Sequence, residues 1–412
     1  MTQLVKDSQY FKFCMYGFLK NLRFFDAFFI LFLIQKGLSF TQIGTLYALR
    51  EITINVFEIP SGIIADTFGR KTALAGSFLI YILSFILFYS SNNFWFFLGA
   101  FVLYGIADAF RTGTHKGMIM HYLKINNWQN QKINYYGHTR SWSQKGSAIS
   151  ALLAGLLVFF SGDYRYIFLF SIVPYLINFG LILSYPKTLN KFQNKATNKE
   201  DKGLRFIIKS MFKVLKIPKV LKIINTTSIH TAYLKAVKDY IQPLMLQVIA
   251  LIPLFYQLDV KKKNGLLIGI LYFIIYILTS NASRLSSKVV QKNRQNIAYL
   301  TLLFGFGFGL VSGLFFTYNL WFLSLIAFVG IYIIENIRKP ILTGFIAEEV
   351  PNDILTSVIS VQSQLKTIMT AILAFVFGLC ADYFGISMAF IIISLGLIIL
   401  TIVLNSLVKN KT

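Results

Sequence analysis

Long apolar segments recur along the whole 412-residue chain, and they constrain its fold more than any other feature. A helix needs about 20 apolar residues to cross the ~30 Å hydrocarbon core of a bilayer. Twelve segments approach or exceed that length, at about 12–35, 41–64, 72–91, 94–122, 132–160, 164–185, 219–250, 264–288, 295–317, 320–348, 354–380 and 386–408. The chain is therefore predicted to be an all-α integral membrane protein with twelve transmembrane helices.

Positive charge is concentrated between these segments. The net charge is +24, and the range Pro186–Lys222 holds eleven Lys or Arg residues against two acids. Basic loops between spans favour the cytoplasmic side of a membrane. The gap that contains Arg70 and Lys71 agrees with this rule, whereas Lys261–Lys263 is an exception. We expect both termini on the cytoplasmic side, a lipid bilayer as the partner of the chain, and no nucleic-acid partner.

The basic linker also divides the chain into halves. It separates an N-terminal bundle of six helices (1–185) from a C-terminal bundle of six helices (219–412), with 186–218 between them. Bases at 205, 209, 213 and 216 are spaced as in an amphipathic helix on the inner leaflet, although a cytoplasmic extension of the next span fits equally well. Gly155 and Gly378 occupy corresponding places in the two halves, which indicates an internal repeat.

Residues that would indicate a cofactor are missing from the sequence. Cys14 and Cys380 are isolated in apolar surroundings, and no His or Glu cluster has zinc-ligand spacing. No phosphate-binding Gly-rich loop with Lys-Ser/Thr occurs either. We expect no metal, no cofactor, no catalytic residues and no ATP-driven pump. The first apolar segment carries charges and lacks a cleavage site, so it is predicted to be a span rather than a signal peptide.

A short polar motif separates the second and third apolar segments. It reads Gly-Ile-Ile-Ala-Asp-Thr-Phe-Gly-Arg-Lys, from Gly62 to Lys71. Gly62 permits close helix approach, Asp66 can accept hydrogen bonds from Arg70, and Gly69 permits a tight reversal. The motif resembles the loop between helices 2 and 3 of the major facilitator superfamily of secondary transporters, with Thr67 where that family usually has a base.

This resemblance implies two pseudo-symmetric six-helix bundles and transport by alternating access. It also implies a conformational gate, at Gly62, Asp66, Gly69, Arg70 and Lys71. We expect a monomer in a bacterial inner (plasma) membrane that binds a small-molecule substrate. The gap at 281–288 falls where the second half should carry its copy of the loop, but the motif there is degenerate.

Ionisable residues lie within several spans, where their burial in lipid is unfavourable unless they have a function or a partner. The resemblance places helices 1, 4, 7 and 10 around the central cavity, and all four carry charge. The predicted substrate-binding residues are Arg23, Arg111, His115, Lys116, Lys235, Lys238 and Arg338. The predicted proton-coupling residues are Asp26, Asp108, Asp239 and Glu335.

The bases outnumber the acids, so an anionic or zwitterionic organic solute is the expected substrate. Two alternatives stay open. Pairs such as Asp108 and Arg111 are three residues apart on one helical face and can neutralise each other without binding a ligand. Lys20, Lys116 and Lys339 can extend to an interface instead of facing a cavity.

A narrower resemblance occurs in the fourth span, over Gly105–Leu123. This stretch is similar to a bacterial subgroup whose members are mostly described as efflux permeases. His115 and Lys116 stand where that subgroup has acids, and Phe101 stands where antiporters have an arginine. We expect a secondary transporter, either a proton-coupled efflux antiporter or an uncoupled facilitator or uptake carrier. A non-transporting membrane sensor is the remaining alternative.

Overall fold

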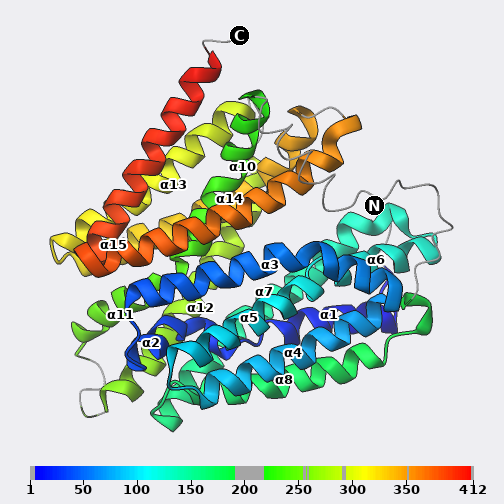
Figure 1. The fold of residues 1–412 in the computed structure, drawn as a ribbon, viewed down its shortest axis with the longest axis horizontal. Helices are drawn as coiled ribbons and strands as arrows, with labels where there is room; N and C mark the ends of the chain where they lie inside the picture. The colour runs from blue at the N-terminus through cyan, green and yellow to red at the C-terminus, as the bar shows by residue number, and fades with distance from the viewer. Residues whose placement is uncertain are drawn as a thin grey trace. The chain divides into compact units, whose positions relative to one another are not determined.

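The computed structural model describes residues 5–190, 218–253, 257, 259–289, 294–349 and 352–409, and all regular secondary structure in these ranges is helical. The α-helices are α1 (Ser8–Lys20), α2 (Phe29–Gln35), α3 (Phe40–Phe68), α4 (Arg70–Ser90), α5 (Phe94–Arg111), α6 (Thr114–Ile125), α7 (Lys132–Ser161), α8 (Tyr166–Leu183), α10 (Pro218–Val237), α11 (Ile241–Ala250), α12 (Val260–Val289), α13 (Arg294–Thr317), α14 (Trp321–Glu349) and α15 (Asn352–Lys409) (Figure 1). Short 3₁₀ turns are η1 (Phe24–Ala27), η2 (Gln129–Gln131), η3 (Lys187–Leu189) and η4 (Lys238–Tyr240).

The helices match the predicted apolar segments. Within the described residues, eight helical stretches are long and apolar enough to cross a bilayer. One of them lies in α15, which covers the last two predicted spans and is interrupted at Gly385, where φ is 83°. The predicted first and seventh spans are divided into α1 and α2, and into α10 and α11, while α3 covers the charged second span. The prediction of an all-helical membrane protein is confirmed.

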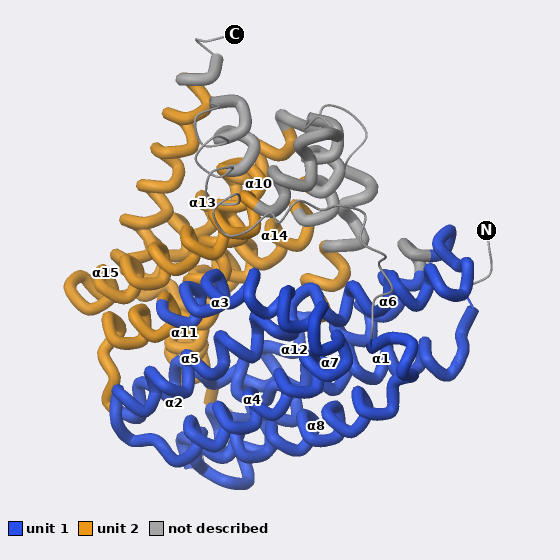
Figure 2. The backbone as a smooth tube through the Cα atoms, turned by 45° about the vertical axis from the view of Figure 1, so that its right-hand side comes forward, with its two compact units in different colours: residues 1–36, 49–197, 255–276 blue, residues 37–48, 198–254, 277–412 orange. Residues whose placement is uncertain are grey.

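The chain forms two compact units, shown in Figure 2. The first unit comprises residues 1–36, 49–197 and 255–276, and the second comprises 37–48, 198–254 and 277–412. The start of α3 thus belongs to the second unit, and the start of α12 belongs to the first. The division that we predicted, at the 186–218 linker, stays a prediction, because most of that linker lies outside the described residues.

Matching glycine contacts explain why the start of α3 packs in the second unit and the start of α12 packs in the first. In the first unit, a Cβ atom at Gly155 of α7 would lie 3.1 Å from the Cα of Gly269 in α12. In the second unit, a Cβ atom at Gly44 of α3 would lie 3.2 Å from the Cα of Gly378 in α15. Small residues let helix backbones approach this closely in membranes. The two predicted repeat positions, Gly155 and Gly378, therefore make equivalent helix contacts.

Asp382 strengthens the contact in the second unit. Its two carboxylate oxygens accept hydrogen bonds from the backbone N–H groups of Phe40 (2.8 Å) and Thr41 (2.7 Å), in the first turn of α3. A carboxylate at a helix N-terminus satisfies N–H groups that have no partner within the helix. The start of α3 is thereby attached to α15.

Aromatic side chains fill the interior of the first unit. Phe25 of η1 is stacked on Phe168 of α8 with ring centroids 5.4 Å apart, and Phe29 is stacked on Phe101 at 5.2 Å. In lipid, where the hydrophobic effect between helices is weak, such packing contributes much of the attraction. It fixes the interrupted first span against α5 and α8, and so positions its charged residues.

Two further predictions concern the ends of elements. The predicted amphipathic helix over 204–216 lies outside the described residues. The gap expected at 281–288 stays a prediction: the apolar span ends at Ala282, and α12 continues as helix to Val289. A degenerate motif without the Gly and Asp of a reversal gives the backbone no reason to leave the helix there.

Candidate substrate site at the charged helix breaks

Three of the four spans expected to face the cavity are interrupted at their charged residues. In the first span, Arg23 and Asp26 lie between α1 and α2. In the seventh, Lys238 and Asp239 form part of η4, between α10 and α11. Broken helices expose backbone groups that can bind a polar ligand, and in transporters they often mark the substrate site.

The fourth span breaks directly after Arg111. Gly113 adopts a φ of 84°, in the left-handed region that favours glycine, and the chain then enters α6 at Thr114. No side chain caps the N-terminus of α6. The first N–H groups of this 12-residue helix therefore remain available, together with the positive end of its dipole.

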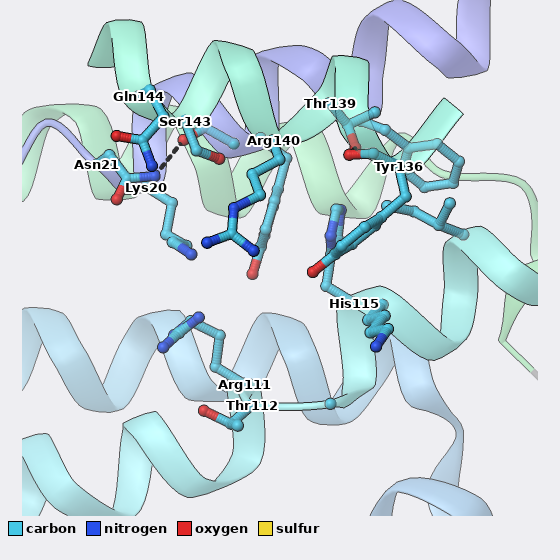
Figure 3. Close-up of a pocket in the computed structure, with 16 residues that line it drawn as sticks. Lys20, Asn21, Arg111, Thr112, His115, Tyr136, Thr139, Arg140, Ser143 and Gln144 are labelled. Carbon is cyan, nitrogen blue, oxygen red and sulfur yellow. Dashed lines mark hydrogen bonds between the residues drawn. The ribbon is translucent and has the colours of Figure 1, made fainter. Parts of the chain in front are cut away.

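A cavity of about 530 Å³ adjoins this break inside the first unit. Among the described residues that line it, none is acidic, and five carry a basic side chain. They come from α1, the α5–α6 junction and α7: Lys20, Arg111, His115, Lys116 and Arg140. Figure 3 shows Lys20 and Arg140 pointing across the cavity toward Arg111. Asn21, Thr112, Thr139, Ser143 and Gln144 add neutral polar groups.

The bases of the cavity differ in their pairing. Arg111 Nη2 lies 2.5 Å from Asp108 Oδ1, and Arg111 Nε donates to Tyr81 Oη at 2.9 Å. Tyr81 also donates to Asp108, so this carboxylate is held by two partners. The side chains of Lys20 and Arg140, in contrast, have no hydrogen-bond or ion-pair partner among the described residues. Both side chains therefore face the cavity without a direct ion pair.

Aromatic rings form the wall beside these bases. The His115 imidazole is stacked on Tyr16, with ring centroids 3.6 Å apart and planes at 11°. Its Nε2 lies 3.3 Å from Tyr185 Oη. Lys116 Nζ lies 5.4 Å from the centre of the Tyr136 ring, a cation–π contact. One side of the cavity therefore offers apolar surface, and the other side offers positive charge.

Arg23 lies outside this cavity. It lines a much smaller pocket with Asp26, where Nη2 of Arg23 is 3.2 Å from Oδ2 of Asp26. Its Nη1 donates to Tyr104 Oη at 3.0 Å. Of the four substrate-binding residues predicted in the first unit, the structure brings together Arg111, His115 and Lys116, and leaves Arg23 apart.

The second unit carries a buried polar cluster. His230 Nδ1 lies 2.8 Å from Glu335 Oε2, and both side chains are only 1% exposed. Thr231 donates to the other carboxylate oxygen at 2.7 Å. Arg338, one turn further along α14, is fully buried and donates from Nη1 to Ala298 O (2.6 Å) and from Nη2 to Thr226 O.

The remaining charges of the seventh span have weaker roles in this unit. Lys238 Nζ lies 3.4 Å from Asp239 Oδ1, and Tyr47 donates to the other oxygen of Asp239 at 3.1 Å. Lys235 is exposed. Within the described residues, each of the four predicted proton-coupling acids thus has at least one polar partner.

The predicted gate loop is an ordered turn. Arg70 donates to Asp66 Oδ1 from Nε (3.2 Å) and from Nη2 (3.1 Å). Gly69 has a φ of 102°, and any side chain there would collide with Asn190. Asn190 accepts from the N–H of Arg70 (2.9 Å) through its backbone oxygen and from the N–H of Lys71 (3.1 Å) through Oδ1. Gly62 is exposed with open space around it.

Comparison with known proteins identifies the family. The family model described as Major Facilitator Superfamily matches residues 14–374. The chain belongs to the Major Facilitator Superfamily. An uncharacterized MFS-type transporter of Bacillus subtilis (strain 168), YxaM, is 23% identical over 357 residues, which cover 86% of this chain and 84% of YxaM.

Solved transporter structures share its fold. A variant of the nucleoside transporter NupG has a TM-score of 0.77 at 13% identity and covers 96% of this chain and 99% of its own. A variant of the peptide transporter POT has a TM-score of 0.73 at 12% identity, with coverages of 98% and 94%. The resemblance inferred from the Gly62–Lys71 motif is confirmed, and the chain is a multi-pass membrane transporter of this superfamily.

Sequence reasoning about this superfamily member missed two residues of the cavity as ligand groups. An interface position was one alternative for Lys20, and Arg140 was noted only as a charge within the fifth span, but both line the cavity opposite Arg111. A signal for Arg140 exists, since it lies in the fifth apolar segment without an acid three or four residues away.

Proposed function

We propose that this superfamily transporter moves a small organic anion or zwitterion, whose negative group binds in the first-unit cavity. The observation that carries this proposal is the cavity lining: five basic side chains and, among the described residues, no acid. Positive charge in a cavity with low-dielectric walls attracts anions strongly. A cationic drug, in contrast, would meet repulsion from every ionised base.

Two of these bases have chemistry suited to direct binding. Lys20 and Arg140 have no partner among the described residues, so a bound anion would supply the missing counter-charge. The guanidinium of Arg140 matches carboxylate or phosphate through two parallel hydrogen bonds. The uncapped start of α6 adds N–H donors and a favourable dipole at the same cavity.

Arg111 has a different proposed role. Because Asp108 and Tyr81 already hold its guanidinium, we assign it to orienting the ligand rather than to supplying an unpaired charge. His115 and Tyr136 would contact the organic part of the solute. The cavity volume, about 530 Å³, suits a metabolite-sized molecule.

The experiment measures uptake and binding by purified protein in proteoliposomes. The panel contains monocarboxylates, dicarboxylates, phosphate esters, amino acids and size-matched cations. Arg140→Gln should weaken binding of the transported anion about tenfold, as loss of one charge-assisted contact does. Lys145→Gln is the matched control, because Lys145 lies on the same helix, is exposed and does not line the cavity. Transport of cations only, or equal losses in both variants, would contradict the proposal.

Proton coupling is proposed to run through His230 and Glu335. Their side chains are buried and in direct contact, and carboxylate–histidine chains of this kind serve as proton relays in transporters. Asp26 and Asp108 are the alternatives, but arginines hold both as ion pairs. Each of these pairs neutralises its own charge within the span, which gives both acids a structural role.

The coupling test imposes a proton gradient of either sign on the same proteoliposomes. Wild-type flux should follow the gradient, whereas His230→Gln should exchange substrate at a rate that ignores it. Asp26→Asn serves as the comparison variant and should keep its gradient dependence. If wild-type flux is itself independent of the gradient, the transporter is an uncoupled facilitator. The direction of the coupled flux decides between efflux and uptake.

The orientation of the chain in the membrane is also part of this proposal. The basic gaps support a bacterial inner-membrane location with both termini cytoplasmic. Cysteine introduced at Asn194 should stay protected from impermeant thiol reagents in intact cells. Labelling from outside would reverse this orientation.

A further inference from the structure

A second cavity of the first unit lies apart from the substrate cavity. It has a volume of about 660 Å³ and shares no lining residue with the substrate cavity. It lies where the start of α4 meets the end of α8, two helices that pack side by side (Figure 1). Its polar end carries Lys71 and Lys187, and its apolar walls include Leu79, Phe179 and Leu183.

The polar and apolar parts of this cavity are arranged as at a membrane interface. Lys71 lies in the first turn of α4, and Lys187 follows the end of α8, so both mark the same end of two membrane-spanning helices. Leu79 lies about 12 Å further along α4, at ~1.5 Å per residue. The cavity thus begins at the level of lipid headgroups and continues along the acyl chains.

We propose that this groove binds one anionic phospholipid. The headgroup phosphate would lie between Lys71 and Lys187, and one acyl chain would follow Leu79, Phe179 and Leu183. Charge complementarity supports an anionic headgroup, because two lysines and, among the described residues, no acid line the groove. Lys187 is exposed and has no partner among the described residues. Lys71 donates to Tyr185 O at 2.8 Å, which leaves two of its three protons for the phosphate.

Gly76 provides the space for the chain. It lies in the lining of the groove, and a Cβ atom added there would meet no other heavy atom within 4 Å. A larger side chain at this position would extend into the groove without disturbing the contact between α4 and α8. The site also adjoins the Gly62–Lys71 loop, so a bound anionic lipid would stabilise that loop independently of the transported substrate.

The test compares lipid retention by native mass spectrometry and thermal protection in detergent. The probes are phosphatidylglycerol and phosphatidylcholine with identical acyl chains, and inorganic phosphate alone. Wild-type protein should retain phosphatidylglycerol in preference, and Lys187→Gln should reduce that preference about fivefold. Gly76→Leu should reduce retention of both lipids while the unliganded protein unfolds at the wild-type temperature.

Lys124→Gln is the matched control, since Lys124 is an exposed lysine at the end of α6 and lies outside the groove. Its lipid preference should equal that of the wild type. Equal retention of both lipids by the wild type would mean that the groove holds only ordinary boundary lipid, without headgroup preference. An equal loss in the control, or equal protection by inorganic phosphate alone, would also overturn the proposal.

Discussion

Arginines in the two units have opposite surroundings. Arg140 faces the first-unit cavity without a partner among the described residues, whereas Arg338 is fully buried in the second unit and donates to Ala298 O and Thr226 O. Both lie in apolar spans. We therefore expect a charge in a span to support function where its partner is absent, and to support the fold where its partners are already present.

The largest effect expected from this comparison is on stability. Arg338→Met removes hydrogen bonds that join α14 to α10 and α13, and bonds to charged groups contribute about 1.5–3 kcal/mol each. The variant should unfold at a clearly lower temperature in detergent, followed by tryptophan fluorescence. Arg140→Met is the matched control and should unfold as the wild type does. If Arg338→Met is as stable as Arg140→Met, the structural role of Arg338 is wrong.

Arg111 is intermediate between these two cases, because it is paired but also lines the cavity. Arg111→Gln should weaken anion binding by about tenfold or more, since it removes a contact and leaves Asp108 without its base. The double variant Asp108→Asn/Arg111→Gln removes the unpaired acid as well. It should stay impaired if Arg111 contacts the ligand. Normal binding by the double variant would make the pair purely structural.

The loop between α3 and α4 offers a paired charge at the surface. Asp66→Asn loses the hydrogen bonds from Arg70, so we expect turnover to fall about tenfold, equivalent to ~1.4 kcal/mol, with anion affinity retained. Asp163→Asn is a suitable control, because Asp163 forms a similar exposed pair with Arg165 in another loop. Wild-type turnover in Asp66→Asn would remove the gate assignment.

The smallest effect should come from Lys116. Its side chain is exposed and makes a cation–π contact with Tyr136, so Lys116→Gln should change anion affinity only about threefold. Titration calorimetry with the transported anion measures this change. A tenfold loss would show that a base with a partner can bind the anion as strongly as Arg140, which has none.

The apolar segments predicted the helices well, because spanning a bilayer requires a length that can be counted. Arg111, His115 and Lys116 were predicted together because they follow one another along a single span. Lys20 and Arg140 were missed, since the faces of α1 and α7 that meet at the cavity depend on packing between helices. The partners of Arg338 are backbone carbonyl groups, which a sequence does not distinguish from any others.

The contact of Asn190 with α4 has a mechanical consequence. It holds the first turn of α4 through its backbone oxygen and its side chain, and it lies near the start of the 186–218 linker. The covalent connection between the halves of the chain is therefore anchored at the Gly62–Lys71 turn, and not at a free helix end. A change in linker length would therefore act directly on this turn, which Asp66 and Arg70 also hold in place.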